Sequence, residues 1–169
     1  LSTPYRLSPA NEDRQGDVSA LYRHTIWRRD TAFGTDRLGL LGGAIIPTAN
    51  DRDPAAQAGF VYTHFELRHE IDIDLLYRTG VEERLDSGQY DASWQYRLSP
   101  VARSDWGLAR EIYSVIELNG RWRETNIISH QITVGLQWIH QKLVVEGGMV
   151  RDINNEKEPQ ILLSTRFHF

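Results

Sequence analysis

Closely spaced carboxylates are the feature of this sequence that most suggests chemistry. Asp72 and Asp74 are two residues apart, a spacing that places both side chains on one face of a β-strand. Two carboxylates on one face could carry out acid–base catalysis or hold a cation. Every strand with a polar face produces the same arrangement, so the pair favours an ordinary polar face over a catalytic or metal site.

The histidines, serines and glycines also lack the spacing of a recognisable site. The pair His69-Glu70 is followed by Ile-Asp-Ile, so the His-Glu-x-x-His pattern of a zinc site is absent. Ser129-His130 and Ser164 could belong to a membrane-embedded hydrolase, but no third residue is placed to orient them. Gly39 to Gly43 lacks the spacing of a dinucleotide-binding loop. We therefore predict no enzyme activity, no metal and no cofactor.

The composition excludes several classes of protein. The chain has 169 residues, which suits a single domain over 1–169, with 19 Lys+Arg and 23 Asp+Glu giving a net charge of −4. This balance lacks the basic surface expected of a nucleic-acid partner. The longest uncharged apolar run, Leu38 to Ile46, is too short for a helix that needs about 20 residues to cross a bilayer. The chain begins with Leu1 and has no cysteine, so we expect a processed or N-terminally truncated product without disulfides.

Alternation of apolar and polar residues is the dominant pattern, and it predicts β-strands. In Tyr90 to Leu98 every second residue is apolar or aromatic, as in a strand with one apolar and one polar face. The ranges 70–78, 131–138 and 161–169 repeat the pattern. Weaker strands are predicted at 18–28, 36–46, 59–67, 108–118 and 142–151, with a short one at 1–7. In 18–28 neither set of alternate residues is cleanly apolar, so its faces stay unassigned.

These strands predict an all-β, antiparallel, up-and-down barrel of about ten strands. In a soluble barrel the apolar face would point inward, whereas in an outer-membrane barrel it would face lipid. Strands of about 9–11 residues fit a bilayer crossing, and longer and shorter connections alternate along the chain, as in outer-membrane barrels. The longer connections are expected at 8–17, 47–58, 79–88, 119–126 and 152–159.

Aromatic residues near the strand ends also favour the membrane interpretation, because aromatic rings concentrate at membrane interfaces. One rim would carry Phe65, Tyr96, Trp138, Phe167 and Phe169, and the other Tyr77, Tyr90 and Trp122. Phe167 and the terminal Phe169 share one face of the last strand. This ending resembles the C-terminal signal read by the outer-membrane barrel assembly machinery.

The opposite face would line the lumen with charged and polar side chains. The predicted lumen residues are His64, Glu66, Asp72, Asp74, Arg78, Asp91, Gln95, Arg97, Glu111 and Glu117. In a narrow barrel such groups pair across a filled interior, while a wider barrel leaves an aqueous path. Both readings stay open from the sequence.

Residues 36–48, with Gly43, Pro47 and Thr48, resemble a strand of the outer-membrane family named for the MetA-pathway of phenol degradation. Ala49 stands where that family usually has glycine. Two further segments, 117–120 and the Gly-rich 145–149, extend the likeness over residues 36–169. The resemblance implies a barrel of about twelve strands, of which this chain would be the C-terminal part, and transport of small, often aromatic, compounds.

The sequence thus predicts a channel in the outer membrane of a Gram-negative bacterium. Its expected partners are outer-membrane lipid, the barrel assembly machinery and a small solute. The acidic residues of the lumen predict a modest preference for cations or neutral solutes. The alternatives are a non-conducting structural barrel and a soluble, lipocalin-like carrier, although a Gly-x-Trp start typical of the latter is missing.

Overall fold

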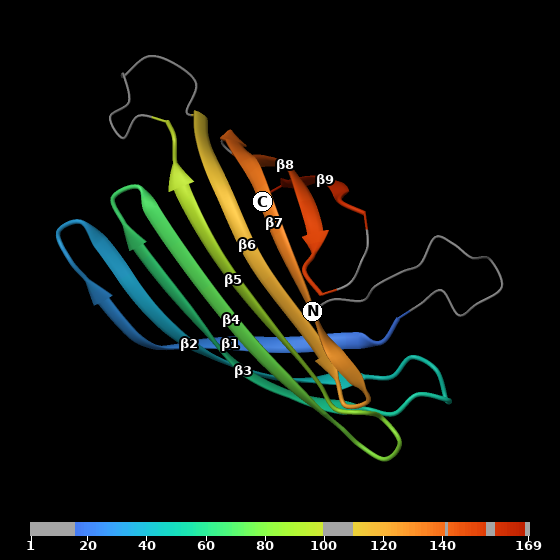
Figure 1. Ribbon diagram of the computed structural model, residues 1–169. Coiled ribbons are helices and arrows are strands. Elements are labelled where there is room, and N and C mark those ends of the chain that lie inside the picture. Colours follow the sequence, from blue (N-terminus) through green and yellow to red (C-terminus); the bar gives the residue numbers. More distant parts are fainter. Residues whose placement is uncertain (1–15, 100–109, 141, 155–157, 168–169) are drawn as a thin grey trace.

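The chain folds into one sheet of antiparallel strands in sequential order. The computed structural model describes residues 16–99, 110–140, 142–154 and 158–167. The nine strands are β1 (Val18–Asp30), β2 (Gly34–Ile46), β3 (Ala55–Glu66), β4 (His69–Gly80), β5 (Ser87–Arg97), β6 (Arg110–Arg123), β7 (Asn126–His140), β8 (Leu143–Asp152) and β9 (Gln160–Phe167). Figure 1 shows a strongly twisted and curved sheet. Within the described ranges there is no helix of the length and apolar character needed to cross a membrane.

The all-β, up-and-down antiparallel prediction is confirmed for these ranges. Each of the nine longer predicted strands corresponds to one strand of the sheet, because alternation specifies a strand wherever one face is apolar. The predicted short strand at 1–7 lies outside the described residues. β1 and β9 are the two edges of the sheet and do not pair with each other.

The connections alternate between two rims of the sheet. We call the end with connections 47–54, 81–86, 124–125 and 153–159 the first rim, and the end with 31–33, 67–68, 98–109 and 141–142 the second rim. One predicted length is wrong. The expected long connection at 119–126 is mostly strand, since Asn119 pairs with Gln131 and Gly120 with His130.

The register divides the side chains into two faces of opposite character. Directly paired residues share a face, and Asp72 pairs with Thr63 and Ser93, which defines the polar face. Ile71, Ile73 and Leu75 alternate with these residues and define the apolar face. Paired residues extend both faces from β1 to β9.

Burial is the reverse of that in a soluble sheet. Nearly all of the buried side chains in the described residues belong to the polar face, with Asp36 as the exception. The buried members of the polar face are Ile45, Ala55, Gln57, Val61, Leu76, Tyr113, Val115, Thr133, Gln137, Val144 and Asp152. The apolar face instead exposes large side chains, including Trp94, Val134, Leu163 and Phe167. We infer that the sheet curves around its polar face, where side chains shield one another.

Charged side chains hold the connections of the first rim together. Asp17 accepts hydrogen bonds from Arg84 Nη1 at 2.8 Å and from Arg52 Nη1 at 3.2 Å. Arg84 Nη1 also donates to the carbonyl oxygen of Asp53 at 2.6 Å. In the next connection, hydrogen bonds from the Tyr77 hydroxyl and the Gly80 N–H lower the pKa of Asp86.

Replacing Asp17 with asparagine is expected to remove a pH-dependent part of the stability. Burial raises the pKa of Asp17, but the hydrogen bonds from Arg84 and Arg52 outweigh burial and leave this pKa below its ordinary value. A carboxyl whose pKa is lowered on folding stabilises the fold above its unfolded pKa of about 3.9, and that contribution is lost as the pH falls through the folded pKa. Urea titrations at pH 3 to 7 should therefore show a shallower acid loss for Asp17→Asn. Asp51→Asn, an exposed change in the connection 47–54, should keep the wild-type slope; equal slopes for all three proteins would contradict the prediction.

Two glycines of the apolar face accommodate aromatic rings across β5 and β6. Gly88 pairs with Trp122, and Gly120 pairs with Tyr90. A Cβ on Gly120 would lie 2.0 Å from Tyr90 Cε1, and one on Gly88 would lie 2.2 Å from Trp122 Nε1. Each ring therefore occupies the space above the facing glycine, an arrangement that covers glycine within a sheet.

Gly120→Ala is expected to destabilise the sheet by about 1–3 kcal/mol, the usual cost of overpacking. The added methyl would displace the Tyr90 ring and break the 2.6 Å hydrogen bond between Tyr90 Oη and His130 Nδ1. Gly42→Ala is the matched control, because its Cβ would meet no atom within 4 Å. Urea unfolding followed by tryptophan fluorescence tests the pair. Equal midpoints for the two variants would show that the rings do not depend on the glycine.

Candidate functional site: the polar face

Eight of the ten predicted lumen residues lie together on the polar face. These residues come from three neighbouring strands, β4, β5 and β6, and are Asp72, Asp74, Arg78, Asp91, Gln95, Arg97, Glu111 and Glu117. The direct pair Asp74 with Asp91 brings two carboxylates of adjacent strands side by side, and Glu117 of the next strand pairs with Ser93. The sequence therefore located the polar surface correctly along this part of the chain.

His64 and Glu66 lie on the apolar face, so the expectation that they share a face with Asp72 is corrected. His64 pairs with Ile71 and Glu66 with His69. The reason is the connection Leu67-Arg68, which has two residues. Across it, each even-numbered residue of β3 pairs with an odd-numbered residue of β4. The even residues of β3 consequently oppose the odd residues of β4, and Phe65, expected at an aromatic rim, belongs to the polar face.

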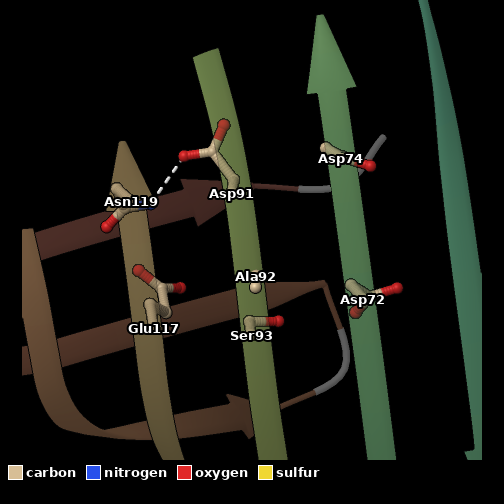
Figure 2. A pocket seen from close by; sticks show the side chains of 7 residues that line it. All are labelled: Asp72, Asp74, Asp91, Ala92, Ser93, Glu117 and Asn119. Carbon is tan, nitrogen blue, oxygen red and sulfur yellow. Dashed lines mark hydrogen bonds between the residues drawn. The ribbon is translucent and has the colours of Figure 1, made fainter. Parts of the chain in front are cut away.

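A depression of about 280 Å³ lies at the centre of this face. Figure 2 shows its lining from β4, β5 and β6: Asp72, Asp74, Asp91, Ala92, Ser93, Glu117 and Asn119. Asp91 accepts a 2.6 Å hydrogen bond from Asn119 Nδ2, and Asp72 accepts a 2.7 Å bond from Thr63 Oγ1. Among the described residues, none of the four carboxylates forms an ion pair. The depression therefore concentrates acidic side chains, with Arg23, Arg78 and Arg166 interacting with them electrostatically from outside its lining.

A chain of hydrogen bonds crosses the polar face between this depression and the first rim. Arg78 donates from Nε to Gln57 Oε1 at 3.1 Å and from Nη2 to Gln89 Oε1 at 2.9 Å. Gln57 continues the chain to Ser19 Oγ at 2.9 Å, and Gln89 continues it to Asp91 at 3.4 Å. Because its partners are neutral amides, Arg78 is fixed in position without its charge being neutralised by a bonded carboxylate.

Toward the second rim the polar face carries paired charges. Arg97 Nη2 lies 3.1 Å from Glu111 Oε1, and the Tyr113 hydroxyl donates to Glu111 Oε2 at 2.7 Å. Gln95 lines a neighbouring depression of about 260 Å³ with Glu70, Gln137 and Arg166. Of the predicted lumen residues, Arg97 and Glu111 thus form an ion pair toward the second rim, whereas Asp72, Asp74, Asp91 and Glu117 line the central depression.

The described residues supply no arrangement for metal binding or nucleophilic catalysis. No group of three or more His, Asp or Glu side chains within the described ranges could hold a metal ion. Ser129 pairs with Arg121 and His130 with Gly120, which places this serine and histidine on opposite faces. Ser164 Oγ donates to Glu146 at 3.5 Å, and no hydrogen bond joins it to a histidine among the described residues. What the polar face can do is solvate and attract small polar or cationic species.

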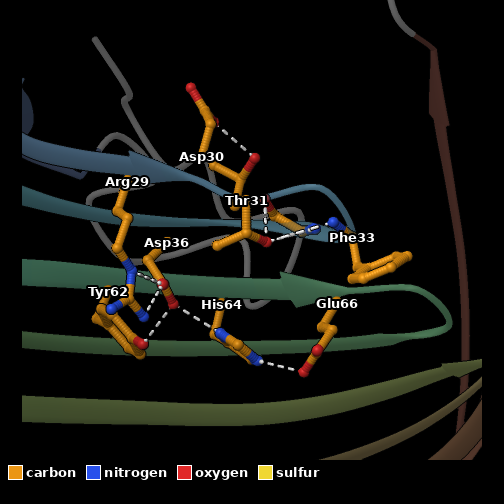
Figure 3. Close-up of polar contacts among 10 residues, drawn as sticks. Arg29, Asp30, Thr31, Phe33, Asp36, Tyr62, His64 and Glu66 are labelled. Atoms are coloured by element: carbon orange, nitrogen blue, oxygen red, sulfur yellow. Dashed lines mark hydrogen bonds and ion pairs between the residues drawn. The ribbon is translucent and has the colours of Figure 1, made fainter.

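A charged network on the apolar face was not foreseen from the sequence. Figure 3 shows Asp36 at its centre, contacted by Arg29, Tyr62 and His64. A register shift between Thr25 and Trp27 turns Arg29 toward this face. The only sequence signal was the irregular alternation of 18–28, which a β-bulge produces by adding one residue to a strand.

The predicted assembly signal is described only in part. Phe167 pairs with Leu143 on the apolar face and is 65% exposed, while Phe169 lies outside the described residues. Ile161, Leu163 and Thr165 share the face of Phe167, in agreement with the predicted alternation of the last strand.

Comparison of the chain with known proteins adds no relative to this picture. The resemblance to the phenol-degradation family therefore stays a prediction, and the proposed function rests on the geometry of the two faces. Searches of protein-family models, curated proteins and solved structures each gave no match for the chain.

Proposed function

We propose that the sheet forms part of the wall of an outer-membrane β-barrel that acts as a channel for small solutes. The polar face of the sheet would point toward the lumen. The observation that carries this proposal is the reversed burial: the polar face is the shielded one, and the apolar face is exposed. Water strongly disfavours an exposed surface of this apolar content, whereas lipid tails favour it. A soluble carrier of lipocalin type would need the opposite assignment.

Aromatic side chains of the apolar face support a membrane position. Near the first rim Tyr77 lies 5.8 Å from Trp122, between ring centroids. Near the second rim His69 contacts Trp94 and Tyr96, and Trp138 stacks on His140 at 5.6 Å. The eight-residue steps from His69 to Tyr77 and from His130 to Trp138 each measure about 27 Å along a strand. At the usual tilt of about 40° this gives an apolar band about 20 Å tall, near the height typical of outer-membrane barrels.

Closure of such a barrel with antiparallel pairs throughout requires strands beyond the nine in the sheet. In an up-and-down sheet with nine strands, β1 and β9 run in the same direction, so their edges cannot form an antiparallel pair. An odd number of further strands between these edges would restore antiparallel pairing throughout. Closure is necessary in lipid because an open edge leaves backbone N–H and C=O groups without partners.

The acidic depression supports a channel over a purely structural barrel. In a sealed interior, burying uncompensated carboxylates is costly, so charges there are normally paired. Arg97 and Glu111 form an ion pair of the kind expected in a sealed interior. The carboxylates of Asp72, Asp74, Asp91 and Glu117 form no ion pair among the described residues. Asp74 Oδ1 is buried without a hydrogen-bond partner, but in the channel the accessible oxygens of these groups would be hydrated and would favour cations and neutral polar solutes over anions.

Two measurements test the proposal in sequence. The folded, detergent-extracted protein should migrate faster on an SDS gel before boiling than after it, because closed barrels resist SDS until heated. In planar bilayers it should then produce discrete conductance steps. A heat shift without conductance would favour the non-conducting structural barrel. Recovery of folded protein without detergent would contradict the membrane position and favour a soluble ligand carrier.

A further inference from the structure

We propose that the network of Arg29, Asp36, Tyr62, His64 and Glu66 binds the phosphoethanolamine headgroup of a membrane phospholipid. This inference rests on the proposed membrane position of the apolar face. The network joins the last residues of β1 and β3 to the beginning of β2 at the second rim. Glu66 pairs with His69 of the aromatic group, which places the network at the level where lipid headgroups meet the hydrocarbon region.

The network gathers most of the charge on the apolar face. Among strand residues of that face with described side chains, the only Asp, Glu, Lys or Arg outside it is Arg151. Charged groups on a lipid-facing surface are unfavourable except near the interface. Their collection at one point of the second rim therefore indicates a specific contact with the headgroup region.

Asp36 organises the network and is only 3% exposed. Its Oδ2 accepts from Arg29 Nε at 2.9 Å and Nη2 at 2.7 Å. Its Oδ1 accepts from the Tyr62 hydroxyl at 2.9 Å and contacts His64 Nδ1 at 2.6 Å. The carboxylate is thus fully occupied, and it fixes the orientation of Arg29 on one side and His64 on the other.

Arg29 presents donors suited to a phosphate group. A guanidinium has five N–H bonds, and Asp36 engages two nitrogens, so three N–H bonds stay available on a side chain that is 63% exposed. The Trp27 ring lies 5.8 Å from Arg29 Cζ and restricts the guanidinium further. A positioned guanidinium with parallel free N–H bonds is a preferred partner of phosphate oxygens.

His64 and Glu66 present acceptors suited to a primary ammonium group. When the His64 ring is neutral, its proton lies on Nδ1 because Asp36 Oδ1 is an acceptor, and Nε2 is then an acceptor. Nε2 lies 3.7 Å from Glu66 Oε2, and the Glu66 side chain is 56% exposed. An ethanolamine ammonium can donate to both groups. A choline group has no N–H to donate, and a glycerol headgroup has no positive charge.

Native mass spectrometry of the detergent-folded protein tests this assignment. Phosphatidylethanolamine, phosphatidylcholine and phosphatidylglycerol with identical acyl chains would be added in equal amounts, and the bound fractions compared. The wild type is expected to retain phosphatidylethanolamine preferentially. Glu66→Gln should reduce that preference about tenfold, as expected for loss of a charged hydrogen-bond partner, and leave the hydrogen bonds of Asp36 in place. The control Glu158→Gln removes an exposed carboxylate in the connection 153–159 at the first rim and should keep the wild-type preference.

Equal retention of the three lipids by the wild type would overturn the headgroup assignment, as would an unchanged preference in Glu66→Gln. The heat-shift gel separates this failure from failure of the proposed function. A heat-shifted protein without lipid preference would refute only the headgroup site. A protein that folds without detergent would refute the membrane position, and the headgroup site with it.

Discussion

Val134→Arg is expected to destabilise the folded protein in lipid vesicles by about 2–4 kcal/mol, the cost of an arginine at the lipid-facing midplane of a barrel. Val134 lies on the apolar face midway between His130 and Trp138 and is 53% exposed. On the surface of a soluble protein, such an exposed position tolerates substitution within about 0.5 kcal/mol. The two environments therefore give different results for the same change. Urea unfolding in phosphatidylcholine vesicles, followed by tryptophan fluorescence, measures the difference.

Val81→Arg supplies the control for this experiment. Val81 is 46% exposed but lies in the connection 81–86 at the first rim, outside the apolar band. We expect its substitution to leave the midpoint almost unchanged. If Val134→Arg were equally harmless, the apolar face would not be in contact with lipid, and the orientation of the sheet would have to be reversed.

Removing two charges from the acidic depression is expected to reduce the cation preference of the channel at least about fivefold. The double variant Asp74→Asn and Glu117→Gln alters the two lining carboxylates for which no hydrogen bond is found among the described residues, so the bonds of Asp72 and Asp91 are kept. A single charge about 4 Å from a passing ion contributes about 1 kcal/mol even in water-like surroundings. Reversal potentials in a salt gradient measure this preference directly.

The exchange Asp74→Glu with Glu117→Asp is the control for charge, because it changes the shape of the depression and keeps both carboxylates. It should retain the cation preference of the wild type. Anion preference in the wild type would refute the assignment of this face to the lumen. An unchanged preference in the neutralised variant would show that ions pass elsewhere.

The positions of the strands were predictable because alternation is a local property. Tyr90 to Leu98 and Gln131 to Trp138 each contain enough alternate apolar residues to specify a strand with one apolar face. The ends of strands were less predictable. Gly120 looked like part of a turn, but it continues β6 because the Tyr90 ring fills the space that its missing side chain leaves.

Which residues share a face depends on pairing, and pairing is not local. The alternate set His64 and Glu66 seemed continuous with Asp72 and Asp74 until the register across Leu67-Arg68 was known. Arg29 meets Asp36 only because of the register shift after Thr25. Such contacts between strands cannot be read from the alternation of either strand alone, since a shift of one residue exchanges the faces.

For the proposed outer-membrane location, the alternation that exposes an apolar surface in the folded sheet also has a consequence for export. In the unfolded chain the apolar residues of each strand are separated by polar ones, and the mean hydropathy is −0.47. An unfolded chain with this pattern contains no segment hydrophobic enough to leave an inner-membrane translocation channel sideways as a transmembrane helix. The apolar surface comes into being only when strands pair, so in the proposed outer-membrane location the chain would cross one membrane unfolded and become suited to the other on folding.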